Sequence, residues 1–251
     1  MIRCTIEQGV GHLVLNRPEK RNALTPEMLA EFVRGLSRLS GECGAVVVRG
    51  EGEAFCAGFD LSLCREDSAA LAELLCGLSD AVRAMRGVAA PVVVAAHGAA
   101  IAGGCALLGG GDVVVTDAGA KLGYPVVRLG ISPSVSAPTL RLRTGDGAAR
   151  ERLLDPGLID GRRAVEVGLA DECVASPAGV RERAEGIARM LASKPRCGVA
   201  ATKRWLNELD GLEGGEMLNQ ALGVSLSLVG SAEERERLAA MWSRDTKGKE
   251  A

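Results

Sequence analysis

The chain has 251 residues, enough for one substantial core or for one core with a helical appendage. Its 30 basic and 32 acidic residues leave a formal net charge of −2, a balance that argues against nucleic-acid and membrane-surface partners. No apolar run reaches the roughly 18 residues that a membrane helix needs, and the first residues do not resemble a signal peptide. We therefore expect a cytoplasmic protein.

The eight cysteines are scattered, and no two of them form a Cys-x-x-Cys pair. His12 and His97 are the only histidines. Zinc sites are built from closely spaced cysteine and histidine ligands, so the sequence predicts no metal site. Isolated cysteines in apolar surroundings are typical of reduced, buried thiols.

The N-terminal part alternates short apolar runs with helical patterns. Ile2–Glu7 and His12–Asn16 are predicted to form a β-hairpin, joined through residues 8–11. A helix with Thr25 as its N-cap and a proline in its first turn is predicted to continue to about Leu39.

Further along, the pattern continues and then becomes helical. Val-rich strands are predicted at Ala45–Arg49, Pro91–Ala96 and Asp112–Thr116, with a helix of leucine periodicity between Leu71 and Arg86. Beyond about Leu154, helices are predicted at Pro177–Ser193, Pro195–Leu209, Glu213–Val229 and Ala232–Ser243. This order predicts an α/β core, residues 1–190, carrying a C-terminal helical module, residues 191–251, within one structural unit.

Two glycine-containing corners stand out. Phe55–Leu61 follows the strand at Ala45–Arg49, and His97–Ala106 follows the strand at Pro91–Ala96. Glycine allows a positive φ and a close approach to a ligand, and the start of a helix leaves its first N–H groups unpaired. Two such corners in one domain can direct two backbone N–H groups at a single point.

This arrangement resembles the oxyanion hole of the enoyl-CoA hydratase/isomerase (crotonase) superfamily, in which two amides hold the thioester oxygen of an acyl-CoA. The resemblance extends over nearly the whole chain, through segments in the family's order: Asn16–Leu24, Phe55–Leu61, Ala102–Cys105, Leu122–Pro125, Leu129–Pro133 and Ala164–Asp171. It implies a crotonase-like ββα spiral core and a C-terminal helical module that forms homotrimers, often paired into hexamers. It also implies lyase or isomerase chemistry in fatty acid metabolism, with no cofactor besides the coenzyme A of the substrate.

Carried over residue by residue, the resemblance makes the amides of Phe59 and Gly103 the oxyanion donors. Two preorganised N–H groups can stabilise a thioester enolate by several kcal/mol. The remaining substrate-binding positions lie on the loop that carries Lys20 and Arg21 (the basic loop), in the two glycine corners, and where the family forms the pocket for the acyl group. They are Lys20, Arg21, Ala23, Ala57, Asp60, Leu61, Gly104, Ala106 and Val126. Lys20 and Arg21 stand where the family contacts the phosphates of CoA.

The sequence departs from the family at its acid positions. Ala106 and Val126 replace the two glutamates that deliver water in family hydratases, and Ser134 replaces the aspartate of some isomerases and dehalogenases. Alanine and valine cannot transfer protons, which argues against ordinary enoyl-CoA hydration. Tyr124 is a candidate proton donor. Ser132, Ser134 and Ser136 either order a water or a substrate carboxylate, or are small residues in a turn around Pro133.

Two functions therefore stay open. In one, the protein is an enzyme acting on an acyl-CoA thioester through an enolate, by decarboxylation or by hydratase or isomerase chemistry with a displaced residue. In the other, it is a non-catalytic acyl-CoA-binding homologue. His97, Cys56 and Cys105 are expected to be structural, and Asp60 to cap a turn. An apolar stripe is predicted to support the trimer: Leu218, Leu222, Leu226 and Val229.

Overall fold

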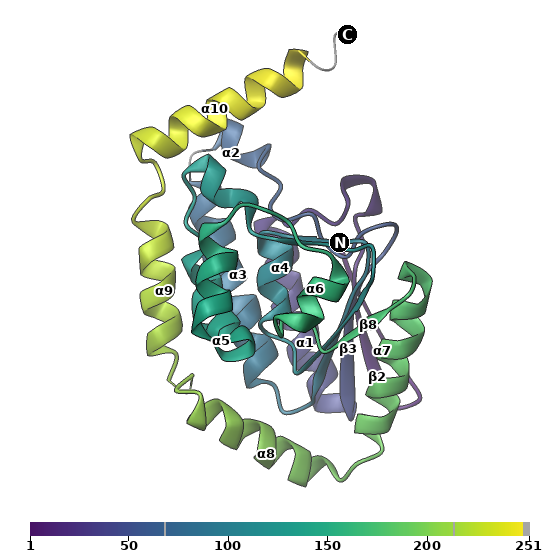
Figure 1. Cartoon of the computed structure of the whole chain (residues 1–251). Coiled ribbons are helices and arrows are strands. Elements are labelled where there is room, and N and C mark those ends of the chain that lie inside the picture. Colours follow the sequence, from purple (N-terminus) through teal and green to yellow (C-terminus); the bar gives the residue numbers. More distant parts are fainter. Residues whose placement is uncertain (68, 213, 248–251) are drawn as a thin grey trace.

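A computed structural model of the chain describes residues 1–67, 69–212 and 214–247 (Figure 1). Its centre is a six-stranded sheet of order β1-β2-β3-β4-β6-β8. The strands are β1 (Ile2–Glu7), β2 (Val10–Leu15), β3 (Ala45–Gly50), β4 (Val92–Ala96), β6 (Val113–Asp117) and β8 (Glu172–Val174). Only β1 and β2 pair antiparallel within this described sheet. The short strands β5 (Ala99–Ile101) and β7 (Lys121–Gly123) form a separate parallel pair.

The predicted N-terminal hairpin is confirmed, but its turn is shorter than residues 8–11. Glu7 pairs with Val10, so only Gln8 and Gly9 remain in the turn. Both have positive φ, 51° and 78°, as a two-residue turn between antiparallel strands requires. Gly11 is a strand residue, and it is a glycine because a Cβ there would lie 2.8 Å from Cys43 Sγ.

The central strands are buried on both faces, which explains their continuous valine runs. Because side chains alternate along a strand, one set enters the larger core: Val46, Val48, Val92, Val94 and Val114. The other set packs beneath α7 (Pro177–Ala192): Ala45, Val47, Val93, Ala95 and Val115. The sheet is therefore the middle of three layers.

The larger core lies between the sheet and the helices of the opposite layer. These helices are α1 (Pro26–Glu42), α3 (Ala70–Gly87), α4 (Gly103–Leu108) and α5 (Ala137–Leu154). The N-cap prediction is confirmed: Thr25 Oγ1 accepts a hydrogen bond from Met28 N at 3.1 Å. The remaining short helices are η1 (Pro18–Lys20), α2 (Leu63–Glu66), η2 (Pro125–Leu129), η3 (Pro133–Ser136) and α6 (Gly161–Glu166).

The C-terminal helices form an arc around the edge of the core (Figure 1). They are α8 (Arg196–Leu209), α9 (Glu216–Leu226) and α10 (Ala232–Lys247). The helix predicted at Glu213–Val229 is shorter in the structure, because Gly214 and Gly215 precede it with positive φ and it ends at Leu226. Glu213 and residues 248–251 lie outside the described residues. No helix in the described ranges combines the length and hydrophobicity needed to cross a bilayer.

The apolar stripe of α9 packs against its own chain. Leu218 is buried, and Leu222, Leu226 and Val229 are half-buried against the larger core, where α9 contacts α3 and η3. The stripe is therefore at least partly used within its own chain. The trimer or hexamer stays a prediction.

Candidate active site

The two glycine corners lie at the carboxyl ends of β3 and β4 and are joined by backbone hydrogen bonds. Cys56 N donates to Ala99 O, and Ile101 N donates to Cys56 O, both at 3.0 Å. Glycine is needed for this approach: a Cβ on Gly104 would lie 2.8 Å from Cys56 Cβ. Gly58 has a φ of 98°, and a Cβ there would lie 3.0 Å from Ile101 O. The corners therefore form one rigid unit.

The amide of Phe59 is left free by the way its loop pairs. Leu24 N donates to Gly58 O at 2.7 Å, and Asp60 N donates to Leu24 O at 2.9 Å. In a parallel bridge of this kind, the central residue directs its own N–H to the opposite side. Within the described residues, Phe59 N donates to no backbone carbonyl.

The amide of Gly103 is set by a strained residue and a helix start. Ala102 has φ 52° and ψ −111°, outside the regions that residues with a Cβ favour. Gly103 begins α4, and the first N–H groups of a helix have no partner within it. A Cβ on Gly103 would lie 3.0 Å from the Phe59 ring, so the two predicted donors belong to neighbouring residues in space.

A small pocket of about 20 Å³ lies beside these two residues. Its lining is apolar except for three hydroxyl groups: Phe59, Leu75, Leu78, Ala102, Gly103, Tyr124, Val126, Ile131, Ser132, Pro133, Val135 and Ser136. Of these described lining residues, none carries a carboxylate, an imidazole or a cation. The site thus has candidate electrostatic stabilisers without an ionisable acid or base of ordinary pKa.

The Tyr124 hydroxyl is held among buried neighbours. Tyr124 is 2% exposed, and its hydroxyl forms hydrogen bonds with Cys105 and Ser136. Burial raises the pKa of Tyr124 well above its ordinary value, so the proton stays on the phenol at neutral pH. Cys56 and Cys105 are fully buried, which confirms that both are packed, and burial raises the pKa of their thiols to about 12.

The three positions at which the family places acids differ in their surroundings. Val126 lines the pocket beside Phe59 and Gly103. Ala106 is 1% exposed in the interior of α4 and does not line this pocket. Ser134 Oγ lies 2.6 Å from Ser132 Oγ, and it lines a neighbouring cavity of about 540 Å³, which shares Ile131, Ser132 and Pro133 with this pocket.

Asp60 and Arg17 form an ion pair that the sequence analysis did not anticipate. Arg17 Nη2 lies 3.0 Å from Asp60 Oδ2, and Ser62 Oγ donates to Asp60 Oδ1 at 2.5 Å. Burial favours the neutral acid, but the hydrogen bonds from Ser62 and Arg17 outweigh it and lower the pKa of Asp60. A backbone hydrogen bond with Ser62 fits the predicted capping role.

Asn22 fastens the basic loop to the first corner. It is fully buried with a φ of 56°, its Nδ2 donates to Glu51 O and Ala54 O at 2.8 Å, and its Oδ1 accepts from Arg17 N at 2.9 Å. Asparagine adopts this left-handed conformation more readily than most residues, and a buried amide needs such partners. The asparagine itself was the sequence signal for this connection.

The remaining predicted residues lie on the same two loops. Lys20 and Arg21 are exposed, and Arg21 O accepts from Ala57 N at 2.9 Å. Ala23 and Leu61 are half-buried. His97 Nε2 lies 2.9 Å from the Gly52 carbonyl oxygen, which confirms its structural role. No three His, Cys, Asp or Glu side chains of the described residues come together as a metal site would require.

The sequence and the fold are similar to those of known proteins. A family model described as enoyl-CoA hydratase/isomerase matches residues 5–240. A relative from Thermus thermophilus is 33% identical over 214 residues, which cover 82% of this chain and 84% of that protein. The crotonyl-CoA hydratase of Syntrophomonas wolfei is 30% identical, covering 80% and 79%. The crystal structure of an enoyl-CoA hydratase/isomerase from Xanthobacter autotrophicus Py2 matches with a TM-score of 0.86 and 30% identity, covering 98% and 97%. The chain has the crotonase fold and belongs to the enoyl-CoA hydratase/isomerase family.

Proposed function

We propose that this protein binds acyl-CoA thioesters and stabilises an enolate with the amides of Phe59 and Gly103. Family membership, the free Phe59 amide and the position of Gly103 at the start of α4 support this assignment. Two fixed N–H donors beside an apolar pocket stabilise developing negative charge without reorganisation, which contributes several kcal/mol to catalysis.

The reaction that fits this site best is decarboxylation of a malonyl-type acyl-CoA. In that reaction the bond between Cα and the carboxylate breaks, and its electron pair moves to the thioester oxygen as CO₂ leaves. Water then protonates Cα, so the protein need not supply an acid or a base. The observation that best supports decarboxylation is the pocket without acidic side chains, whose described lining is apolar apart from three hydroxyls. An apolar pocket also disfavours a substrate carboxylate more than the CO₂ it becomes.

Steady-state assays with two substrates test this proposal. We expect malonyl-CoA or methylmalonyl-CoA to release CO₂ in an enzyme-dependent reaction. We expect hydration of crotonyl-CoA to run orders of magnitude below that of a hydratase with two carboxylates, because each supplies about 10²–10⁴-fold. Ordinary hydration rates without any CO₂ release would refute the decarboxylase assignment.

The buried state of Tyr124 favours a second candidate, a non-catalytic acyl-CoA-binding protein. The one phenol that lines the pocket is buried, and burial raises its pKa well above the ordinary value, which makes it a poor proton donor. Calorimetry distinguishes the candidates: butyryl-CoA binding without turnover of either substrate class supports the binder, and turnover of malonyl-type substrates excludes it.

Lys20 and Arg21 are proposed to hold the phosphates of CoA, because both are exposed on a loop fastened to the first corner. Guanidinium and ammonium groups recognise phosphate through charge-assisted hydrogen bonds. Replacing both by glutamate is expected to weaken CoA binding at low salt, as calorimetry would measure. An unchanged affinity at both low and high salt would remove this assignment.

We also propose a homotrimer, or a hexamer of two trimers. The outer face of α8 supports association, since Trp205, Leu206 and Leu209 are 57%, 53% and 64% exposed. Large apolar side chains gathered on one surface commonly mark an interface. Light scattering at micromolar concentration tests this, and a monomeric mass would refute it.

A further inference from the structure

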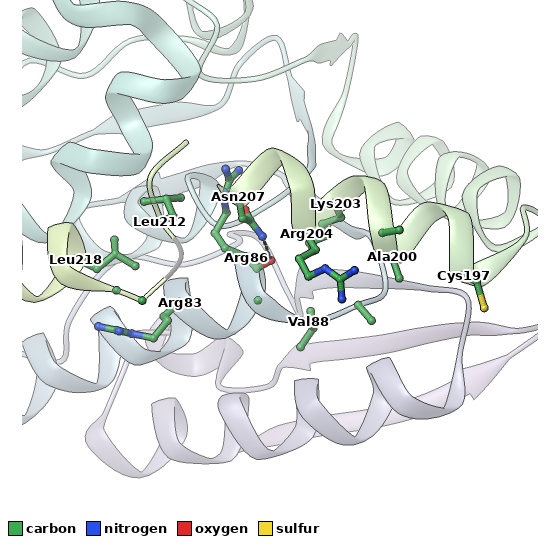
Figure 2. A pocket seen from close by; sticks show the side chains of 15 residues that line it. Arg83, Arg86, Val88, Cys197, Ala200, Lys203, Arg204, Asn207, Leu212 and Leu218 are labelled. Atoms are coloured by element: carbon green, nitrogen blue, oxygen red, sulfur yellow. Dashed lines mark hydrogen bonds between the residues drawn. The ribbon is translucent and has the colours of Figure 1, made fainter. Parts of the chain in front are cut away.

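A second cavity lies at the other end of the molecule from the proposed active site. It has a volume of about 550 Å³ and lies between the C-terminal part of α3 and the helix α8 (Figure 2). Lys203, on its wall, contacts Ala90 O and Asp112, which lie just before β4 and β6. The glycine corners, in contrast, follow the carboxyl ends of β3 and β4. The two sites are therefore at opposite ends of the sheet.

The charge of this cavity is strongly one-sided. Arg83, Arg86, Lys203 and Arg204 all line it, and no carboxylate is among the lining residues that the structure describes. Figure 2 shows Arg83 towards one end of the cavity, Arg86 and Arg204 nearer its middle, and Cys197 towards the other end. A ligand that matched these charges would be negatively charged.

Two of the four cations already have carboxylate partners behind the wall. Lys203 Nζ lies 2.7 Å from Asp112 Oδ2, and Arg86 pairs with Asp210. The other two cations, Arg83 and Arg204, have no carboxylate of the described residues at close range. Arg83 Nη2 donates to the neutral amide oxygen of Asn219 at 2.7 Å, and it pairs with no carboxylate of the described residues. Arg204 Nε lies 3.9 Å from Glu208 and is 73% exposed.

The buried part of the wall also retains an unpaired hydrogen-bond donor. Arg86 Nε is buried without a hydrogen-bond partner. Burial lowers the pKa of Lys203, the Asp112 carboxylate opposes this, and the positive charge of Arg86 adds to the lowering. Like charges thus repel one another along the wall, and a bound anion would relieve that repulsion.

The rest of the wall suits an organic group rather than a bare ion. Val88, Leu212 and Leu218 contribute apolar surface, and Asn207 contributes an amide. The volume lies within the usual range of small-molecule sites, about 300–1,000 Å³. Guanidinium groups bind phosphate in bidentate geometry, which makes arginine the preferred residue for this anion. From this combination, we propose that the cavity binds a nucleoside polyphosphate, with Arg83 and Arg204 contacting its anionic groups.

Isothermal titration calorimetry with ATP as the probe tests the proposal. The variant Arg83→Gln/Arg204→Gln should bind ATP at least about tenfold more weakly than the wild type, because each arginine contributes a charged hydrogen bond. The matched control Arg34→Gln/Arg237→Gln removes the same charge from exposed positions on α1 and α10 and should bind ATP as the wild type does. Tripolyphosphate should bind more weakly than ATP, because it lacks the group that the apolar wall would contact.

Each other result overturns the proposal. Failure of the wild type to bind ATP at millimolar concentration excludes a nucleotide site. Equal weakening in the control variant assigns ATP binding to diffuse surface charge. Loss of ATP binding in Lys20→Gln/Arg21→Gln, with binding intact in the cavity variant, assigns the nucleotide to the basic loop. Equal affinities for ATP and tripolyphosphate exclude a contribution from the nucleoside. No arm contains an acyl-CoA, so the outcome is independent of the function proposed above.

Discussion

The two ends of the central sheet are held together by different kinds of contact. At the carboxyl end, Cys56 and Ile101 connect the glycine corners by backbone hydrogen bonds, and the neighbouring pocket is apolar and free of charged side chains in its described lining. At the amino end, α8 is attached by charge: Lys203 Nζ reaches the carbonyl oxygens of Met85 and Ala90 at 2.9 and 3.2 Å and the carboxylate of Asp112.

The helix α8 accordingly has an inverted amphipathic character. Its polar side chains Lys203 and Asn207 face the core, where Asn207 Nδ2 donates to Arg86 O at 2.8 Å. Its apolar side chains Trp205, Leu206 and Leu209 face outward. In a helix that packs on its own core the pattern is the reverse. The glycine corners are thus fixed by backbone geometry, whereas the position of α8 depends on a few buried polar contacts.

Adding acids to the acid-free end should give the largest effect. The variant Ala106→Glu/Val126→Glu is expected to raise crotonyl-CoA hydration by about 10²-fold or more, and by more than either single change, because two carboxylates act on one water. Val126→Glu alone should be the better tolerated, since Val126 lines the pocket and Ala106 is buried. Steady-state kinetics measure the effect. Rapid hydration by the wild-type protein would mean that another residue already transfers the proton.

Removing the cation at the charged end should destabilise the fold. Lys203→Met leaves Asp112 and two carbonyl groups without their partner, and we expect a loss of about 3 kcal/mol in the free energy of unfolding. Urea denaturation measures this, with Lys194→Met, an exposed lysine just before α8, as the control. A loss below about 1 kcal/mol would show that the buried ion pair does not hold α8 in place.

Adding a single methyl group should destabilise the tightly packed glycine corner but not a helix position with open space around it. Gly104→Ala places a Cβ 2.8 Å from Cys56 Cβ and still closer to the Cys56 carbonyl oxygen, so we expect a loss of about 2 kcal/mol by chemical denaturation. The matched control is Gly186→Ala in α7, where a Cβ meets nothing within 4 Å. There the higher helix propensity of alanine should stabilise the protein by about 0.5–1 kcal/mol. Equal effects at both positions would contradict the tight contact between the corners.

The smallest expected effect concerns the ion pair beside the first corner. The folded-state pKa of Asp60 is lowered, because hydrogen bonds from Ser62 and Arg17 outweigh the burial that opposes ionisation. Its contribution is therefore fully present above the ordinary Asp pKa of about 3.9 and is lost as the pH falls through the lower folded-state pKa. Asp60→Asn should cost about 1 kcal/mol at neutral pH and progressively less in acid, as denaturation at several pH values would show. A stability difference between the wild type and Asp60→Asn that did not change with pH would show that the ion pair does not contribute to stability.

Local sequence patterns accounted for most of the elements and for the corners. Threonine followed by proline marked the start of α1, and uninterrupted valines marked strands buried on both faces, because capping and burial act on neighbouring residues. Short strands such as β8, three residues long, were not foreseen, because their pairing depends on a partner distant in sequence. The two-residue turn of the first hairpin was missed because Gly11 has no side chain to show its place in the strand.

The sequence alone determined the fold class, the two glycine corners and the absence of acids at Ala106 and Val126, since these depend on residue identity and spacing. Which of those residues share a pocket depends on how the chain folds. Folding brings Phe59, Gly103, Tyr124 and Val126 together and places Ser134 in another cavity. Folding also brings Arg83 of α3 and Arg204 of α8 to the same cavity, although 121 positions separate these two residues in the sequence. The physical reason is that a pocket forms where distant segments leave space between packed side chains, and no local pattern encodes that space.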